Sequence, residues 1–200
     1  TNGSVEALEL LLNAGANPNA ALKMGETPLM SAARSGDHAS VKLLIEHGAD
    51  VNRAEFERGQ TALMWAAAQQ HADVVQLLVS NNADLEARTK VWHQLENTAG
   101  NTNPVGNFKM AHGGSTPLLF AARAGDVETA RALVEGGANP NDLAAAGTSA
   151  LVIAAHSGHG ALATYLLRQG ADPNASDAGY TALHAATLRS QVDLVLSLIH

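Results

Sequence analysis

Short apolar segments recur along the 200-residue chain, each introduced by a Gly-x-Thr or Gly-x-Ser triplet. The Thr and Ser residues of these triplets are Thr27, Thr61, Thr116, Ser149 and Thr181, at successive spacings of 34, 55, 33 and 32 residues. Recurrence at such a fixed period is typical of repeat proteins. The pattern therefore predicts units of about 33 residues, with one gap that is longer by about 22 residues.

A second set of residues recurs at the same period, where each apolar stretch ends. Its members are Gly15, Gly48, Asn82, Gly137 and Gly170. Gly is favoured directly after a helix because the backbone often turns there with a positive φ, and Asn is its usual substitute. We expect a left-handed backbone conformation at all five positions.

One unit shows how the pattern specifies local structure. Thr27 is placed to cap a helix with its hydroxyl, and Pro28 suits the first helical position because no N–H is needed there. Apolar residues at helical spacing follow in two stretches, which Gly36 and Gly48 end. One such unit cannot bury its own apolar face, so neighbouring units must stack. We expect an all-α solenoid of stacked helix-turn-helix units with hairpin-like turns.

The recurring pattern "TPLM…AA…G…LL…GAD.N" resembles the ankyrin repeat, whose units carry Thr-Pro-Leu-His and Gly-Ala-Asp at these places. The resemblance implies one ankyrin repeat domain over residues 1–200. Its expected parts are a partial unit at 1–20, units at about 21–53 and 54–87, an insertion at about 88–111, units at about 112–143 and 144–175, and a partial unit at 176–200. The partial units favour a segment of a longer protein.

Two departures from the family pattern carry expectations. The His of the Thr-Pro-Leu-His motif, which the family uses for hydrogen bonds between units, is kept only as His184. Its counterparts are Met30, Met64, Leu119 and Val152, where we expect apolar contact instead. Gln70 and Ser190 replace the Gly between the two helices, and we expect a slightly different turn at both.

Composition narrows the possible partners. The chain is 46% hydrophobic but only 4% aromatic, which predicts a core of closely packed small side chains. Its net charge of −7 argues against nucleic acid or an anionic membrane as the main partner. No apolar run approaches the roughly 18 residues that a membrane-spanning helix needs, and no signal segment is evident. The absence of Cys excludes disulfides and thiol chemistry but leaves the compartment open.

The insertion, "RTKVWHQLENTAGNTNPVGNFKMAHGG" from Arg88 to Gly114, has three interpretations. It is a tolerated loop whose Trp92 and Phe108 pack on adjacent helices, a recognition element, or a catalytic or metal-binding loop. A recognition element would present Trp92, His93, Phe108, Lys109 and Met110.

No motif of catalysis or metal binding is evident. His156 and His159 flank a Gly in a turn, so we expect no metal pair, and His159 is expected to be structural or solvated. Turn residues such as Asp50, Asn52, Asp172 and Asn174 are expected to bond their own backbone. Met30, Met64 and Trp65 are expected to be core contacts between units. The sequence predicts no enzyme, cofactor or metal.

The resemblance implies a module that recognises another protein through the turn tips and the concave face of the first helices. Carried over position by position, the expected contact residues are Lys23, Met24, Glu26, Glu57, Arg58, Gln60, Ala145, Ala146, Thr148, Asp177 and Tyr180 at the tips, and Arg34, Gln69, Arg123, His156 and Arg189 on the first helices. The insertion would add Trp92, Phe108, Lys109 and Met110. The mixed charges argue against DNA, and we expect the fourth and fifth units plus the insertion to make the main contact. Two alternatives stay open, namely a regulatory or structural arm of a larger enzyme or receptor, which would bind its own chain, and a small-molecule site under the insertion.

Overall fold

In the computed structural model, the backbone is described for residues 2–97 and 107–199, and the side chains for residues 5–95 and 109–199. The described residues form eleven α-helices and one two-stranded antiparallel sheet. The helices are α1 (Asn2–Asn13), α2 (Pro28–Ser35), α3 (His38–Glu46), α4 (Ala62–Ala68), α5 (Ala72–Ser80), α6 (Pro117–Ala124), α7 (Val127–Glu135), α8 (Ala150–Ser157), α9 (Gly160–Arg168), α10 (Ala182–Leu188) and α11 (Val192–Ile199); the strands are β1 (Trp92–Asn97) and β2 (Asn107–His112).

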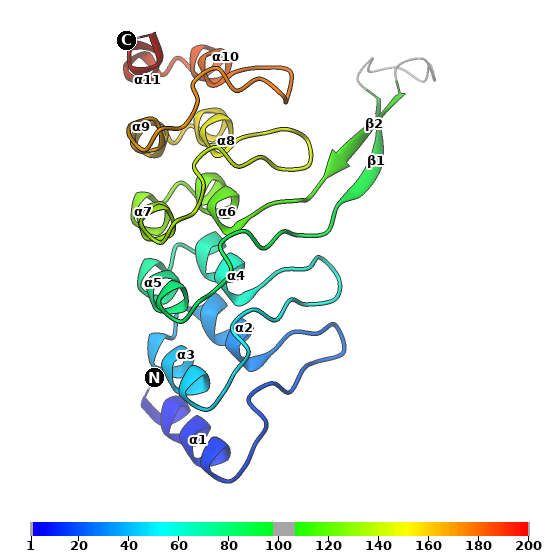
Figure 1. The fold of residues 1–200 in the computed structure, drawn as a ribbon, viewed down its shortest axis with the longest axis vertical. Coiled ribbons are helices and arrows are strands. Elements are labelled where there is room, and N and C mark those ends of the chain that lie inside the picture. The colour runs from blue at the N-terminus through cyan, green and yellow to red at the C-terminus, as the bar shows by residue number, and fades with distance from the viewer. Residues whose placement is uncertain (1, 98–106, 200) are drawn as a thin grey trace.

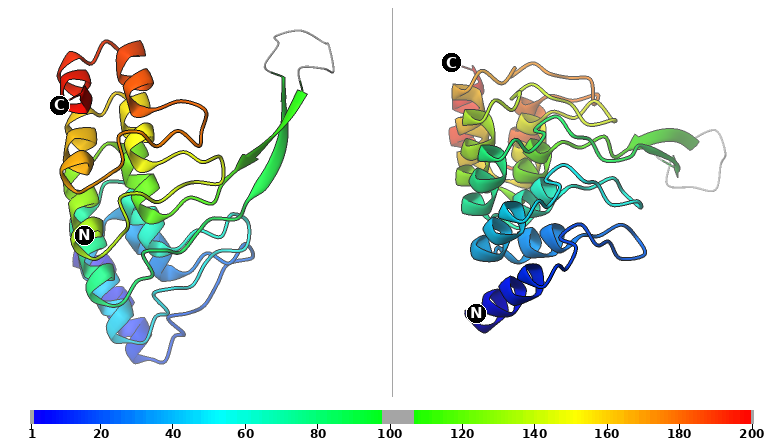
Figure 2. Two further views of the ribbon diagram at one scale, coloured as in Figure 1. Left: turned by 45° about the horizontal axis from the view of Figure 1, so that its top comes forward. Right: turned by 60° about the horizontal axis from the view of Figure 1, so that its bottom comes forward.

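Helices α2 to α11 pack as antiparallel pairs that stack in chain order, and α1, which precedes the first pair, contacts α3 (Figure 1). Helices α2, α4, α6, α8 and α10 form an inner layer, and α3, α5, α7, α9 and α11 form an outer layer, each helix contacting its counterpart in the next pair. The turns between pairs project to one side of the inner layer, as Figure 2 shows. The prediction of a stacked, all-α repeat array is confirmed, and the small sheet is an addition to it.

Most inner helices begin as the sequence predicts. The hydroxyls of Thr27, Thr61, Ser149 and Thr181 each accept a hydrogen bond from the backbone N–H three residues on. Thr116 differs, because its side chain makes no capping bond to α6 and its buried hydroxyl has no hydrogen-bond partner among the described residues. The repeated Thr therefore marks the helix start in every unit without serving as a side-chain cap in every unit.

The left-handed residues are where the pattern places them, including two that we expected to differ. Asn82 has φ 61°, as predicted for a Gly substitute. Gln70 and Ser190 also keep positive φ values of 63° and 54°, but α4 and α10 end one residue earlier than the helices that Gly follows, so the expectation of a slightly different turn is confirmed at both. The turn survives because its two backbone hydrogen bonds fix it. The N–H of Gln70 and that of His71 bond the carbonyls of Ala67 and Ala66, at 3.3 and 3.1 Å.

The core follows the two helical layers and consists mainly of Ala, Leu and Val. Met30, Met64, Leu119 and Val152, which replace the motif His, are all buried, so the predicted apolar substitution is confirmed. His184 itself bonds within its own unit, its Nδ1 accepting from the backbone N–H of Thr181 at 3.2 Å. The bond between units that the resemblance implied for His184 is not seen among the described residues.

Polar contacts between neighbouring pairs come instead from the start of the outer helices. The Nε2 of His71 lies 3.1 Å from the carbonyl oxygen of Arg34, and that of His159 lies 3.2 Å from that of Arg123. Both rings must carry the proton on Nε2, because a carbonyl oxygen only accepts. His159 is thus structural. Gly125 is required beside it, since a Cβ there would come within 2.4 Å of the imidazole ring.

The turns carry a second type of contact between units. Asp50 and Asp172 bond their own backbone as predicted, accepting from the N–H two residues on. For Asn52 the prediction is wrong, because its side chain bonds the next unit: the amide donates to the carbonyl of Asn82 at 3.0 Å and accepts from the N–H of Asp84 at 2.7 Å. Asn19 and Asn141 make the same pair of bonds to the next unit. We call this two-bond contact the Asn clamp.

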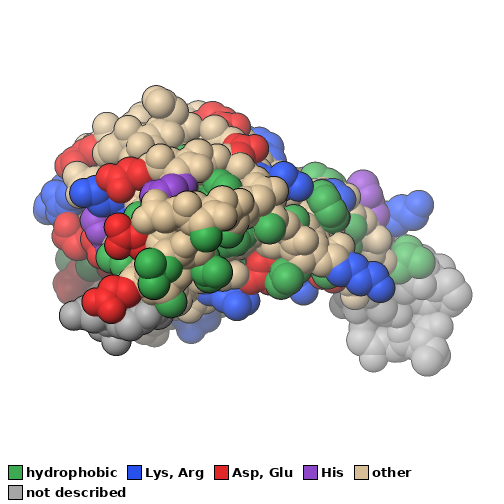
Figure 3. Space-filling view, turned by 90° about the horizontal axis from the view of Figure 1, so that it is seen from below, with side chains coloured by type: hydrophobic (Ala, Val, Ile, Leu, Met, Phe, Trp, Pro, Cys, Tyr) green, Lys and Arg blue, Asp and Glu red, His purple; other side chains and the backbone are tan. Residues whose placement is uncertain are grey.

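Both ends of the array expose apolar side chains. Leu10 and Leu11 of α1 are exposed, and Figure 3, viewed from that end, shows hydrophobic side chains open on this face. At the other end Val192, Leu196 and Ile199 of α11 are exposed. The continuation of the array beyond residues 1–200 stays a prediction.

The capping of α3 gives a test of local stability. The Asp37 carboxylate accepts from the N–H and the hydroxyl of Ser40, at 3.1 and 2.7 Å. The hydrogen bond from the Ser40 hydroxyl, followed by that from its backbone N–H, holds the pKa of Asp37 below its ordinary value. Asp37→Ala is expected to lower the free energy of unfolding by about 1 kcal/mol at neutral pH.

A depressed folded-state pKa means that this contribution is complete above the unfolded-state pKa of about 4 and is lost as pH falls through the folded value. Urea unfolding of the wild type and of Asp37→Ala at pH 7 and pH 3 is therefore expected to give a smaller difference at pH 3. An equal difference at both pH values would contradict the assignment.

Candidate functional site

The projecting turns, which we call fingers, are the residues that precede each inner helix: 17–26, 51–60, 84–115, 139–148 and 172–180. Several fold back as hairpin-like turns, for example through the bond from Glu55 N–H to the Gln60 carbonyl at 3.0 Å. Neighbouring fingers are also joined by backbone hydrogen bonds. These run from Phe56 N–H to Met24 O at 2.8 Å, from Lys90 N–H to Arg58 O at 2.7 Å, and from Ala145 N–H to Gly113 O at 3.0 Å. The first four fingers thus form a connected wall beside the inner helices.

Three adjoining pockets lie where this wall meets α2, α4 and α6, and Gln60 lines all of them. The finger pocket, about 280 Å³, is lined by Met24, Glu26, Glu55, Glu57, Arg58, Gln60 and Trp65. The helix pocket, about 210 Å³, is lined by Arg34, Gln60, Trp65, Ala68 and Gln69. The hairpin pocket, about 220 Å³, is lined by Arg58, Gln60, Thr89, Trp92, His112, Gly113, Ser115, Phe120 and Arg123. Together they form a groove along the finger side of the array.

Trp65 is one of the two Trp residues that line the groove, and the prediction that it is a core residue is wrong. It is only half-buried and lines both the finger pocket and the helix pocket. The guanidinium of Arg34 lies 4.7 Å from the centre of its ring, and the Glu26 carboxylate lies 3.6 Å from Arg34. The buried indole N–H of Trp65 has no hydrogen-bond partner among the described residues. An aromatic ring held by a paired arginine is a common anchor in protein interfaces.

One sequence signal could have identified the groove aromatics. Trp65 and Phe120 both lie four residues after the Thr that starts the inner helix, where the first unit has Ser31. In the second and third units that position lines the groove, whereas the positions one residue earlier, Met64 and Leu119, face the core. The apolar pattern alone does not separate the two.

The insertion forms a β-hairpin, which extends the third finger well beyond the others (Figure 1). Trp92 pairs with His112 across the strands, and their rings stack at 5.7 Å between centres. Trp92 is 49% exposed, so it is not covered by the helices. Lys109 and Met110 are exposed on β2. Phe108 pairs with Glu96 in the strand register, but its side chain lies outside the described residues.

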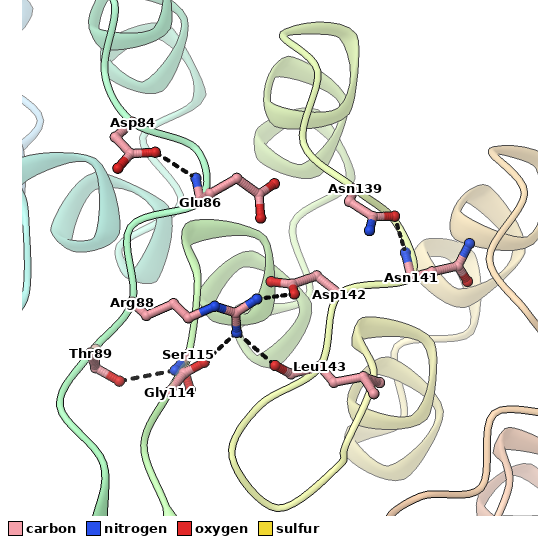
Figure 4. Close-up of polar contacts among 10 residues, drawn as sticks. All are labelled: Asp84, Glu86, Arg88, Thr89, Gly114, Ser115, Asn139, Asn141, Asp142 and Leu143. Atoms are coloured by element: carbon pink, nitrogen blue, oxygen red, sulfur yellow. Dashed lines mark hydrogen bonds and ion pairs between the residues drawn. The ribbon is translucent and has the colours of Figure 1, made fainter.

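The base of the hairpin is tied to the fourth finger by Arg88 (Figure 4). Its guanidinium donates to the carbonyls of Gly114 and Leu143, at 3.0 and 2.8 Å, and forms an ion pair with Asp142. Beside it, the Thr89 hydroxyl accepts from the N–H of Ser115 at 3.0 Å. These contacts fix where the hairpin leaves the array.

Arg88 lies at the junction where the Asn clamp is missing. Glu86 occupies the clamp position in the third finger, opposite the turn that contains Asn139 (Figure 4). Its N–H still bonds Asp84, as Asn52 does with Asp50, so the backbone keeps the geometry that a clamp requires. A Glu side chain is longer than Asn and lacks the amide donor.

Glu86→Asn is therefore expected to restore the clamp and raise the free energy of unfolding by about 1 kcal/mol. Chemical denaturation measures the gain, and the reverse change Asn52→Glu in an intact clamp is the matched control, with an expected loss of similar size. A Glu86→Asn variant that is less stable than the wild type would contradict the equivalence of the two positions.

Most of the expected contact residues of the first three fingers come together in the groove. Met24, Glu26, Arg34, Glu57, Arg58, Gln60, Gln69, Trp92 and Arg123 line the three pockets, and Lys23 is exposed at the first finger tip. The others extend along the same side of the later units: Ala145, Ala146, Thr148, His156, Asp177, Tyr180 and Arg189. Among these, the rings of His156 and Tyr180 lie 6.1 Å apart.

Chemical features outside the groove are few in the part of the chain that the structure describes. It contains no group of three or more His, Asp or Glu side chains able to hold a metal ion. None of its helices is both long and apolar enough to cross a membrane. A further pocket of about 540 Å³ lies between α9 and α11, lined by Gly158, Gly160, Ala161, Thr164 and residues 190–194.

Stacked helix pairs with projecting turns on one side define a helical repeat protein. A sequence model of ankyrin repeats, spanning three copies, matches residues 1–89, 94–177 and 118–200, so the chain belongs to the ankyrin repeat family. None of the curated proteins compared with the chain matches its sequence. Ankyrin repeat arrays are generally protein-binding scaffolds and are typically non-catalytic.

Proposed function

We propose that this array recognises a partner protein by binding an extended segment of it in the groove between the fingers and helices α2, α4 and α6. The observation that carries the proposal is Trp65, half-buried between two pockets beneath the Arg34 guanidinium. Trp and Arg contribute most strongly to protein interfaces when neighbouring residues shield them from water. The joined fingers supply that shielding, and they hold the groove in shape before the partner arrives.

The charges of the groove favour a protein over a uniformly charged polymer. Glu26 and Glu57 line the finger pocket, Arg123 lines the hairpin pocket, and Arg58 lies between the two and lines both. A partner segment with charges of both signs would match this order, and nucleic acid would be repelled at the acidic end. The exposed residues Lys109 and Met110 of β2 and the finger residues Ala145 to Thr148 would extend the contact beyond the groove.

The two alternatives remain testable as variants of this proposal. In a regulatory or structural arm, the bound segment would come from another part of the same chain. A small-molecule site under the insertion has less support, because the pockets of 210 to 280 Å³ are smaller than the usual range of about 300 to 1,000 Å³ for drug-sized ligands.

Peptide display tests the proposal without a known partner. A random library of 12-residue peptides is selected against the chain, and the dissociation constants of the enriched peptides are measured by fluorescence anisotropy. Trp65→Ala and Phe120→Ala are each expected to weaken binding at least tenfold, because each removes an apolar wall of the groove.

Tyr165→Ala is the matched control, since Tyr165 is an aromatic residue of the outer helix α9 that also lies beside an arginine, Arg131. Its effect on peptide binding is expected to stay within twofold, with the folded state of each variant verified by thermal unfolding. Peptides that bind equally well to the wild type, Trp65→Ala and Phe120→Ala would overturn the proposed site.

A further inference from the structure

The hairpin pocket differs from its neighbours in charge. Arg58 and Arg123 line it, together with the aromatic rings of Trp92 and Phe120, and no Asp or Glu belongs to its lining. The acidic residues Glu26, Glu55 and Glu57 line the adjoining finger pocket, which Arg58 also borders. There the Glu55 carboxylate accepts hydrogen bonds from the backbone N–H groups of residues 57, 58 and 60, at 2.6, 2.7 and 2.9 Å. The pocket is thus locally cationic in a chain whose net charge is −7.

The two arginines are exposed and unpaired within the part of the chain that the structure describes. The ion pairs formed there involve Arg34, Lys42, Arg88 and Arg131. Arg34 is a useful contrast, because it lines the helix pocket and already has a carboxylate partner in Glu26. Among the described residues, no carboxylate forms an ion pair of this kind with Arg58 or Arg123.

The backbones of both arginines are nevertheless held in place. The N–H of Arg58 donates to Glu55 and its carbonyl accepts from Lys90, while the carbonyl of Arg123 is bonded by His159. The guanidinium of Arg123 also lies 5.9 Å from the centre of the Phe120 ring. Guanidinium groups carried on fixed backbone lose less entropy when they bind, which favours recognition of carboxylate and phosphate oxygens.

We infer that the hairpin pocket binds an anionic group, a carboxylate or a phosphate, that the partner segment carries on an apolar or aromatic side chain. The volume of about 220 Å³ suits one such side chain. Trp92 and Phe120 contact its apolar part, and Arg58 and Arg123 contact the anion. This inference rests on the proposed function only in assigning the anion to the partner segment. The pocket itself would bind a free aromatic anion by the same contacts.

Nuclear magnetic resonance titration of the whole chain tests the pocket directly. Benzoate and phenyl phosphate are the anionic probes, inorganic phosphate lacks the aromatic part, and benzyltrimethylammonium carries the opposite charge. Saturable amide shifts are expected at Thr89, Gly113 and Ser115 with the two aromatic anions, weaker shifts with inorganic phosphate, and none with the cation.

Arg58→Gln/Arg123→Gln is expected to weaken binding of the aromatic anions at least tenfold. Arg131→Gln/Arg168→Gln changes the net charge equally on the outer helices α7 and α9 and is expected to leave binding within twofold. Equal binding of anions and cation, or anion binding that survives the Arg58/Arg123 change, would overturn the inference.

The peptides from the display selection distinguish the possible carriers. Enrichment of Asp or Glu in peptides whose binding depends on Arg58 and Arg123 supports an anion carried by the partner. Peptides whose binding depends on Trp65 but not on Arg58 or Arg123 would refute the partner segment as the carrier of the anion. They would leave the proposed function intact. Anion binding without any groove-dependent peptide would instead refute the proposed function and leave the pocket as a site for free anions.

Discussion

Replacing Leu119 with alanine is expected to lower the free energy of unfolding by about 3 kcal/mol. Leu119 is fully buried on α6, in the middle of the inner row where α6 contacts both α4 and α8. The substitution removes the transfer energy of three carbon atoms and leaves a cavity that helices fixed on both sides cannot close. Urea denaturation followed by circular dichroism measures the loss.

The stacked architecture also predicts where the loss appears. Each pair contacts only its neighbours, so amide hydrogen exchange in Leu119→Ala should increase most in α4 to α9 and least in α2 and α3. Leu196→Ala is the control, because Leu196 is an exposed leucine of α11 and its loss should cost less than about 0.5 kcal/mol. A Leu119→Ala loss below about 1 kcal/mol would contradict the assigned packing.

The second large effect is expected at the hairpin base, where Arg88→Ala should cost about 2 kcal/mol. The change leaves the Asp142 carboxylate, only 9% exposed, without its cation, and removes the donor from two carbonyls. Breaking a fully buried pair costs about 3 to 5 kcal/mol. The smaller loss of about 2 kcal/mol is expected here because the Arg88 side chain is 43% exposed and water screens its charge in part.

A double-mutant cycle isolates this interaction. Asp142→Asn in the Arg88→Ala background should recover part of the loss, because a neutral amide is less costly to leave unpaired than a carboxylate. Faster amide exchange at Thr89 and Gly114 would localise the effect to the hairpin base. Strictly additive losses from the two substitutions would show that the pair contributes nothing of its own.

Much of the fold could be predicted from the sequence because repetition supplies independent copies of each signal. Five triplets and five helix-ending positions agree on one period, so a single deviant residue such as Asn82 does not obscure it. Gln70 and Ser190 keep the left-handed turn for a related reason. The turn there is set by hydrogen bonds to the preceding helix, and replacing Gly only shortens that helix by one residue.

Other features of the structure depend on which residues of neighbouring units come into contact. The sequence of a single unit does not predict these contacts. Asn52 looks like an ordinary turn residue until the neighbouring finger places Asn82 and Asp84 beside it. Trp65 has the same helical spacing as the core residues but faces the fingers. The hairpin was expected as a loop because its two strands stabilise each other only when paired.

The candidate site, like the fold, could be predicted from the sequence only in part. The resemblance supplied the residue types along the finger side, including Arg58 and Arg123, but with their charges mixed along a ribbon. Their arrangement into a finger pocket with three glutamates and a hairpin pocket without any, which share Arg58 and Gln60, required the coordinates. Phe120, which lines the hairpin pocket, was absent from the expected contact residues.

Hydrogen–deuterium exchange of the whole chain with and without its tightest selected peptide tests the central claim most directly. Binding in the groove predicts protection at residues 22–26, 54–60 and 113–116, with Trp65→Ala abolishing it. Protection confined to the outer helices α3, α5, α7 and α9, with the fingers unchanged, would contradict recognition through the groove.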